Sequence, residues 1–244
     1  MNIKYKLIGA FFKQKTKTEC HKVLLTTNTY YKDLSNIHKK NFVIRTLIFL
    51  WTTDFNSDSE FDLSTEMKII ISSAFVQITF GLKINTLNKF NEIFVTPKSY
   101  SYKNNNAIFD GDVNLRTKKI NMSWPAIERG FNIPDDAMNL SIHEFGHCLI
   151  FENSTRSYLS RIFNERDFDV WKTEAKIKYQ KIKLKQNKVL RDYAGTNLIE
   201  LFSVSLETFF EQPYYFEDNE PKLYLSMTKL LNQDPRNKLN PITK

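Results

Sequence analysis

The segment Ser-Ile-His-Glu-Phe-Gly-His-Cys-Leu-Ile at residues 141–150 constrains this chain more than any other. It contains His143-Glu144-x-x-His147, and on a helix this spacing places two imidazoles one turn apart on one face. Two neutral imidazoles can hold a zinc ion there, with Glu144 beside the position that the zinc leaves open for water. Such a zinc lowers the pKa of its water, and the glutamate takes the proton as the water attacks a carbonyl. The motif therefore predicts a metallopeptidase centre.

A five-residue pattern recurs by chance, so its surroundings matter. Pro134-Asp135-Asp136 favours the start of a helix, with proline early and acids in the first turn. Apolar residues on several sides of the segment indicate a mostly buried helix over residues 135–150: Ala137, Met138, Leu140, Ile142, Phe145, Leu149 and Ile150. The alternative is that both motif histidines are ordinary core or surface residues. In an apolar helix, that alternative requires separate partners for both imidazoles and for the glutamate.

Composition indicates a globular chain with ample material for a core, because 41% of its 244 residues are hydrophobic. The net charge of +8 is concentrated in residues 171–191, which we expect to form a long exposed helix with a basic surface. Nucleic-acid binding by this helix is an alternative to a solvated face, but no recognisable motif accompanies it. Cys20 and Cys148 imply no disulfide framework, and no segment reads as a signal peptide or membrane span. We therefore expect a soluble, cytoplasmic protein.

The pattern of elements predicts a mostly helical α+β protein with a zincin-like core. We expect a basic and flexible or loosely packed lead-in over residues 1–29, a main domain over 30–236 and a polar tail over 237–244. Helical patterns cover residues 30–51, 64–78, 135–150, 171–191, 196–212 and 221–232. Residues 92–96 and 119–124 read as strands, 104–106 and 110–112 as turns, and 54–62 and 153–161 as loops. The strands predict a small sheet beside the motif helix, whose edge can accept a substrate backbone.

A catalytic zinc needs a third protein ligand. His21, His38 and Glu152 are candidates by residue type, whereas no third histidine follows the motif at metzincin spacing. Glu200 is the best candidate, because it lies in an apolar helix where an unpaired carboxylate is costly. The alternative reading of Glu200 is local, since Asn197-x-x-Glu200 also matches a helix capping box.

Two further residues are candidates for supporting roles. Glu207 lies on the same helix face as Glu200, too far inside the helix to be a cap. It is expected to orient a ligand histidine by a hydrogen bond or to form a buried ion pair. Tyr193 can donate a hydrogen bond to the oxyanion of a tetrahedral intermediate, although a loop tyrosine is more often a packing residue.

Together these residues resemble a known family. After the motif come Tyr193 and Glu200, then Glu200-x-Phe202-x-Val204-x-x-Glu207-x-Phe209-Phe210-x-x-Pro213, Pro221-x-Leu223-Tyr224 and Gln233-Asp234-Pro235. Upstream lie Phe90-Asn91-Glu92-Ile93, Pro97 and Trp124. The chain resembles, over residues 30–236, the Mlc titration factor A (MtfA) family of bacterial zinc-dependent peptidases. These share a catalytic-core arrangement with anthrax lethal factor.

The resemblance implies specific roles. His143, His147 and Glu200 would hold one zinc per chain, Glu144 would be the general base, and Tyr193 would stabilise the transition state. The family usually has an aspartate three residues after the second histidine, where this chain has Ile150, so a partner of the ligands is missing or supplied elsewhere, for example by Glu207. The resemblance also implies a transcriptional repressor as a partner beside a peptide or protein substrate. The alternative function is therefore a protein-binding regulator with a structural or vestigial metal site.

Overall fold

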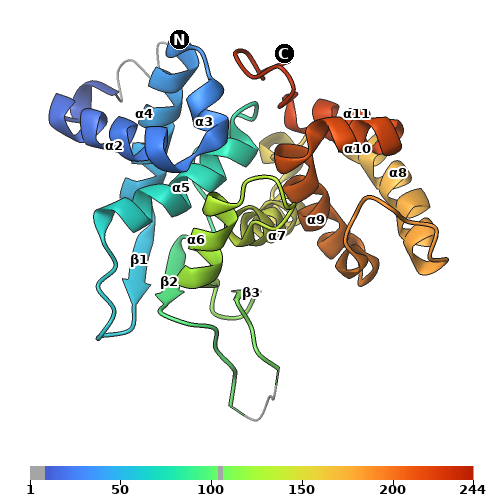
Figure 1. The fold of residues 1–244 in the computed structure, drawn as a ribbon, viewed down its shortest axis with the longest axis horizontal. Coiled ribbons are helices and arrows are strands. Elements are labelled where there is room, and N and C mark those ends of the chain that lie inside the picture. Colours follow the sequence, from blue (N-terminus) through green and yellow to red (C-terminus); the bar gives the residue numbers. More distant parts are fainter. Residues whose placement is uncertain (1–8, 104–106, 244) are drawn as a thin grey trace.

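The computed structural model describes residues 9–103 and 107–243 and confirms a mostly helical α+β fold with one small sheet (Figure 1). The helices of the N-terminal half are α2 (Gln14–Thr27), α3 (Thr29–Asp33), α4 (Asn36–Thr52) and α5 (Thr65–Thr79). Those of the C-terminal half are α6 (Trp124–Asn132), α7 (Leu140–Thr155), α8 (Glu165–Lys183), α9 (Leu198–Glu211), α10 (Pro213–Asn219) and α11 (Pro221–Leu231). Two short 3-10 helices are η1 (Tyr158–Ser160) and η2 (Asp192–Gly195). The helix α7 carries the His-Glu-x-x-His motif and lies at the centre of the molecule (Figure 1).

The sheet is mixed and has the strand order β1-β2-β4-β3. Its strands are β1 (Asp54–Ser57), β2 (Glu92–Thr96), β3 (Gly111–Asn114) and β4 (Lys119–Ser123). The pairs β1–β2 and β2–β4 are parallel, whereas β3 runs antiparallel to β4 with Val113 opposite Ile120. The two central strands were predicted, but the predicted second strand ends at Ser123 because Trp124 already begins α6.

Both edge strands correct the sequence interpretation. Residues 54–57 form β1 where a loop was expected, and residues 111–114 form β3 where a turn was expected. Neither Asp-Phe-Asn-Ser nor Gly-Asp-Val-Asn has the β-branched and aromatic content that marks a strand. Their extended conformation is set by pairing with a neighbour, which a single-sequence pattern does not report.

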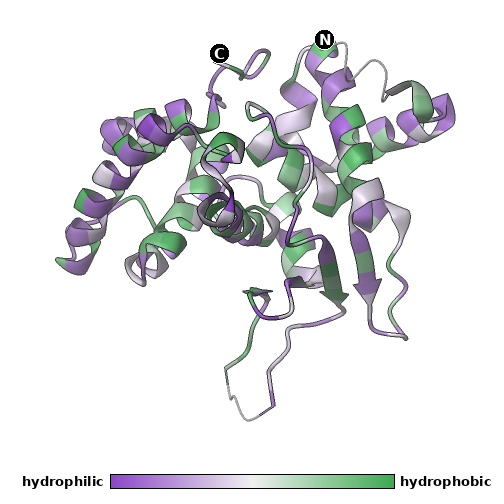
Figure 2. Ribbon diagram, turned by 180° about the vertical axis from the view of Figure 1, so that it is seen from behind, coloured by the Kyte–Doolittle hydropathy of each residue, from purple (hydrophilic) through white to green (hydrophobic). Residues whose placement is uncertain are grey.

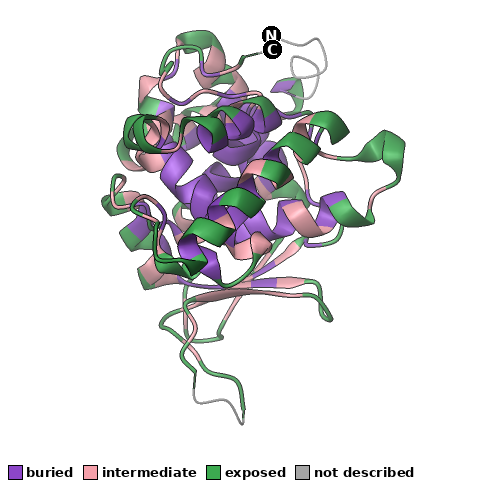
Figure 3. Cartoon of the chain, turned by 90° about the vertical axis from the view of Figure 1, so that its right-hand side faces the viewer, coloured by how far each residue is buried: buried purple, intermediate pink, exposed green. Residues whose placement is uncertain are grey.

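The core is built around three helices. α5 is buried on all sides from Ile69 to Thr79, and most residues of this stretch are apolar. The Phe75 ring stacks on Phe49 of α4 with centroids 4.1 Å apart, and both rings meet Phe145 of α7 edge-on at 5.5 Å. Each buried phenylalanine contributes roughly 1.5–3 kcal/mol by removing its surface from water. Phe145 therefore marks the side of α7 that packs against α4 and α5. Hydrophobic and buried residues gather in these central helices (Figures 2 and 3).

The motif helix starts later than predicted. It begins at Leu140, and the side chain of its N-cap, Asn139, accepts a hydrogen bond from the Ile142 amide. Residues 134–136 lie before it, and Ala137 has a left-handed φ of 56°. The left-handed residue interrupts the helical path that Pro134-Asp135-Asp136 favours, so the cap rather than the proline defines the start. The helix also runs to Thr155, into the expected loop at 153–161.

The N-terminal segment is not a loosely packed lead-in over its described part. Residues 14–27 form α2, whose Cys20 and Leu24 side chains are fully buried in the same core as α4 and α5. Residues 1–8 of that expected lead-in lie outside the described residues. The next helical pattern, at 30–51, is divided into α3 and α4 because Leu34 and Ser35 are extended. No helix within the described residues has both the length and the apolar character needed to cross a bilayer.

The basic helix α8 ends at Lys183, earlier than expected, and one of its lysines is not on the surface. The Lys178 side chain is 1% exposed, and its Nζ lies 2.7 Å from Oε1 of Glu220 before α11. Lys181 lies 3.5 Å from the other oxygen of Glu220 and is 45% exposed. The expected solvated face therefore holds for most of this helix, whereas Lys178 joins α8 to α11.

We expect Lys178→Ala to lower the free energy of unfolding by about 3 kcal/mol. Loss of the Lys178 side chain breaks a buried ion pair and opens a void. Breaking a fully buried pair costs about 3–5 kcal/mol. We expect the lower end of this range because Glu220 keeps Lys181 as a partner. The matched variant Lys181→Ala, which removes an exposed charge, is expected to cost less than about 1 kcal/mol. Urea denaturation followed by circular dichroism measures both. Equal losses would contradict the assignment of Lys178 as the joining residue.

Candidate metal centre

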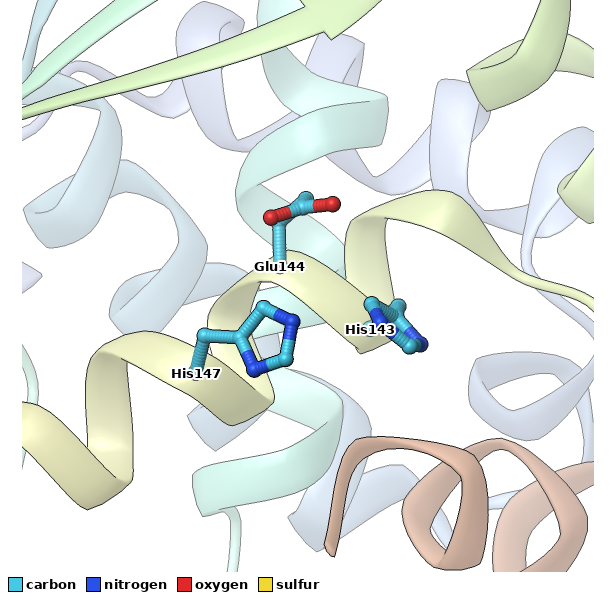
Figure 4. Close-up of side chains that lie close together, drawn as sticks. All are labelled: His143, Glu144 and His147. Carbon is cyan, nitrogen blue, oxygen red and sulfur yellow. The ribbon is translucent and has the colours of Figure 1, made fainter. Parts of the chain in front are cut away.

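The spacing of the motif on α7 brings its three polar side chains together. His143, Glu144 and His147 are 8%, 4% and 9% exposed, and each offers a ligating atom within 4.8 Å of the others. Figure 4 shows both imidazoles and the Glu144 carboxylate projecting from adjacent positions of the helix. Under the alternative interpretation, His143, Glu144 and His147 would have separate and unrelated partners. Their ligating atoms are instead close to one another.

Glu200 comes from α9 and lies against both imidazoles. Its Oε2 is 3.0 Å from Nε2 of His143 and 3.4 Å from Nε2 of His147. Asn197 caps α9 by accepting from the Ile199 and Glu200 amides, so the first half of the expected capping box exists. The Glu200 carboxylate, however, is directed to the histidines. Burial raises the pKa of Glu200, but hydrogen bonds from the two imidazoles outweigh it and lower the pKa to about 2.

Close approach of α7 and α9 makes this convergence possible. A Cβ on Gly146 would lie 2.7 Å from Oγ and 3.2 Å from Cα of Ser203, so only glycine fits between the two helices. The Ser203 hydroxyl donates to the His143 carbonyl at 2.9 Å and lies 3.1 Å from Nδ1 of His147. Ser203 therefore holds the His147 ring. The sequence interpretation missed it, although its position three residues after Glu200 puts it on the same face of α9.

Glu207 holds the other imidazole. Its Oε2 is 3.0 Å from Nδ1 of His143, and its Oε1 accepts from the Asn139 amide at 2.9 Å. Arg191 donates to the same Oε2, so Glu207 makes both the orienting hydrogen bond and the ion pair that were expected as alternatives. Burial lowers the pKa of His143, but hydrogen bonds to Glu200 and Glu207 outweigh it and raise the pKa to about 10. The carboxylates thus strongly favour positive charge at this ring. The sequence interpretation did not identify Arg191 as the ion-pair partner of Glu207.

Glu144 lies on the side of the centre next to β3. Its Oε2 is buried and has no hydrogen-bond partner among the described residues, and burial raises the pKa of this carboxyl to about 8. Gly111 of β3 lies so close that a Cβ there would be 2.7 Å from Oε1 of Glu144. The sheet edge and the glutamate are therefore in contact, as expected for a sheet beside the motif helix.

Tyr193 lies in η2 at the rim of the centre. Its side chain is 51% exposed, and its ring centroid is 5.9 Å from that of His143. The pKa of Tyr193 is raised, first by burial of the phenol and then by the charges of Glu200 and Glu144 and a hydrogen bond to Glu200. The phenol is therefore next to the convergent side chains and accessible from solvent, unlike a packing tyrosine.

The other candidate ligands lie elsewhere. Glu152 is buried, where it accepts from the Lys89 amide at 2.6 Å and pairs with Arg156 at 2.6 Å. His21 is next to Tyr31 and His38 packs against Phe80, both in the N-terminal helices. Ile150, at the position of the family's aspartate, packs against the apolar core.

The residues present fit a metal ion. Two imidazole nitrogens and a carboxylate oxygen form a donor set that catalytic first-row transition metals use. Each imidazole has its Nδ1 beside an oxygen, Glu207 for one and Ser203 for the other, which leaves both Nε2 atoms directed to Glu200. Partners of this kind normally orient metal-ligating histidines. A carboxylate oxygen of Glu144 lies within 4.8 Å of ligating atoms of both histidines.

Comparison with known proteins agrees with this geometry. The model of the glucose-regulated metallopeptidase family M90 matches residues 6–231, including most of the segment expected to be a separate lead-in. An uncharacterised protein of Synechocystis sp. is 23% identical over 221 residues, which cover 84% of this chain and 80% of the relative. Mlc titration factor A of Pectobacterium atrosepticum is 26% identical over 192 residues, 71% of each chain. The resemblance seen in the sequence is thus confirmed, and the chain belongs to the M90 metallopeptidases, the family of Mlc titration factor A.

Proposed function

We propose that the protein is a zinc-dependent peptidase in which His143, His147 and Glu200 hold a single zinc ion. The observation that carries the proposal is the approach of both Nε2 atoms to one oxygen of Glu200, at 3.0 and 3.4 Å. Two histidines and a glutamate are the ligand set of zinc peptidases that keep one position open. Glu144, next to this set with one oxygen free, is suited to proton transfer.

In the proposed reaction, a bound zinc supplies a Lewis acid that activates water and polarises the peptide carbonyl. Glu144 accepts the proton of the attacking water and delivers it to the leaving amine. Tyr193 donates a hydrogen bond to the carbonyl oxygen as negative charge develops on it. Glu207 and Ser203 keep the two imidazole rings in their orientation throughout.

The proposed substrate is an extended peptide that adds to the edge of the sheet. Strand β3 lies at the end of the strand order, and its outer edge pairs with no strand among the described residues. Gly111 brings this edge against Glu144, so a backbone paired with β3 would pass the general base. Main-chain hydrogen bonds of this kind bind peptides with little dependence on their side chains.

The test combines metal analysis with a panel of fluorogenic peptides. The proposal expects one zinc per chain, loss of cleavage on chelation, and recovery on adding one equivalent of zinc. Zinc without cleavage of any peptide would favour the regulator described below. A metal-replete preparation without zinc would contradict the proposal.

We expect Glu207→Gln to weaken zinc binding by about 10–100-fold, the usual cost of losing an outer partner of a ligand. The glutamine side chain at position 207 retains an oxygen that can accept one hydrogen bond. It lacks the negative charge of the carboxylate that orients His143 and pairs with Arg191. Competition with a chromophoric chelator measures the affinity. Glu128→Gln, which removes an exposed acid from α6, is the matched control. An unchanged affinity in Glu207→Gln would restrict Glu207 to a structural role.

A second candidate function is binding of a regulatory protein. It is favoured by the name of the Pectobacterium relative, which describes titration of Mlc by that protein. Glu144→Gln separates the two functions, because a binding module would retain partner affinity in this variant whereas a peptidase would lose turnover. The partner class to test is transcriptional regulators, because the family resemblance implies a transcriptional repressor as a partner.

A further inference from the structure

A second cavity lies behind the metal centre, between α3, the residues before α7, and the α9–α10 junction. It has a volume of about 290 Å³, and its lining includes none of the four proposed metal-centre residues. This is room for a small organic ligand. Three prolines, Pro134, Pro213 and Pro235, are part of the lining and stiffen its walls.

Four aromatic residues contribute to the walls of the cavity. Tyr30, Phe131, Phe210 and Tyr214 line it, and they come from four different elements or loops. Tyr30 and Phe210 meet edge to face with centroids 5.7 Å apart, so this part of the wall is packed in place. Aromatic walls favour apolar groups and organic cations over hydrated metal ions.

One carboxylate in this cavity has no cationic partner. Glu211 accepts a hydrogen bond from the Met138 amide at 3.2 Å, and Asn139 also hydrogen-bonds to it. Burial raises the pKa of Glu211 to about 8, and the charges that act on it, from Glu207 and Asp136, are both negative. No lysine, arginine or histidine of the described residues forms an ion pair with it.

The remaining charges of the lining cancel. Lys238 and Asp33 are the other charged residues there, and their Nζ and Oδ2 atoms pair at 2.9 Å at the exposed rim. Among these lining residues, the Glu211 carboxyl is therefore the group that can supply an uncompensated negative charge, and a bound cation would favour its ionised form. A half-buried carboxylate between aromatic walls is stabilised by a cation more than by any neutral ligand.

We propose that this cavity binds a primary ammonium group, of a free alkylamine or of a lysine side chain, with Glu211 as its counter-ion. The aromatic walls contact the alkyl chain and the ammonium group together. The ligand would lie against Asn139, which lines the cavity, caps α7 and donates its backbone amide hydrogen bond to Glu207. The site is thus behind the helix of the histidine motif and separate from the peptide edge at β3.

Isothermal titration calorimetry on the full chain tests the site. The probes are n-butylammonium chloride and Nα-acetyl-lysine methylamide, with n-butanol as the neutral analogue and NaCl as the ionic-strength control. We expect one site with a Kd in the millimolar range or tighter, and at least tenfold weaker binding of butanol. Binding of the lysine derivative alone would assign the site to a protein side chain, and binding of butylammonium alone to a free amine.

Three variants make the result decisive. Glu211→Gln removes the charge while keeping an acceptor for Met138, and is expected to weaken binding at least tenfold. Thr29→Phe fills the cavity from an exposed position on the opposite wall and should abolish binding even if Glu211→Gln folds poorly. Asp218→Asn, which changes an exposed acid on α10 outside the lining, should bind as the wild type does. No saturable binding of either probe to the wild type, or binding to Glu211→Gln and Thr29→Phe that is as tight as to the wild type, would overturn the proposal. Since no step depends on turnover, the outcome is independent of peptidase activity.

Discussion

Glu144→Gln is expected to lower kcat/KM for peptide hydrolysis by about 10²–10⁴-fold, the contribution of a positioned general acid–base. The amide has the shape of the carboxylate but cannot accept the proton of the attacking water. Glu144 lies beside the histidines without hydrogen-bonding to them, so the ligand set is expected to stay intact. Fluorogenic peptide assays on the zinc-loaded variant measure the loss.

The control for this variant is its zinc content. One zinc per chain together with lost cleavage would assign Glu144 to the chemistry alone. Loss of zinc with loss of cleavage would show instead that Glu144 supports the ligand set. Full cleavage with zinc retained would contradict its role as the base.

Glu200→Ala is expected to weaken zinc binding by well over the roughly 10–100-fold that follows loss of an outer partner. The variant removes the carboxylate that both imidazoles approach and leaves two protein ligands, one fewer than catalytic zinc sites use. Equilibrium dialysis against buffered zinc, with metal analysis of the retained protein, measures the change.

Asn197→Ala is the matched control, because it tests the capping alternative for the same helix end. It removes the side chain that accepts from the Ile199 and Glu200 amides, and is expected to cost about 1 kcal/mol of stability with zinc binding unchanged. If Glu200→Ala instead behaved like Asn197→Ala, with a small loss of stability and normal zinc binding, Glu200 would be a cap and not a ligand.

Residues whose roles follow from local spacing were predictable from the sequence. His143 and His147 share a helix face because they are four positions apart. Glu200 and Glu207 were recognisable because a carboxylate in an apolar helix needs a specific partner. Both carboxylates contact the histidines. For Glu207, the orienting hydrogen bond and the ion pair that were expected as alternatives occur together.

Residues whose roles depend on contacts between distant segments were not predictable. Ser203 touches His147 only because Gly146 lets α7 and α9 approach, and a lone serine has no distinctive spacing. The same limit explains the late start of α7, where Glu207 binds the Asn139 amide from another helix. It also explains β1 and β3, which are strands only beside their neighbours.

The two helices that supply the proposed ligands are far apart in the chain, since His143 and Glu200 are separated by 57 positions. An unfolded chain therefore offers no preformed site, and metal binding adds directly to the free energy of unfolding. A free metal concentration 1,000 times the Kd adds about 4 kcal/mol, a large fraction of the stability of a typical domain. Because degradation by cellular proteases follows the population of open forms, the supply of metal would set how long this protein survives as well as how fast it works.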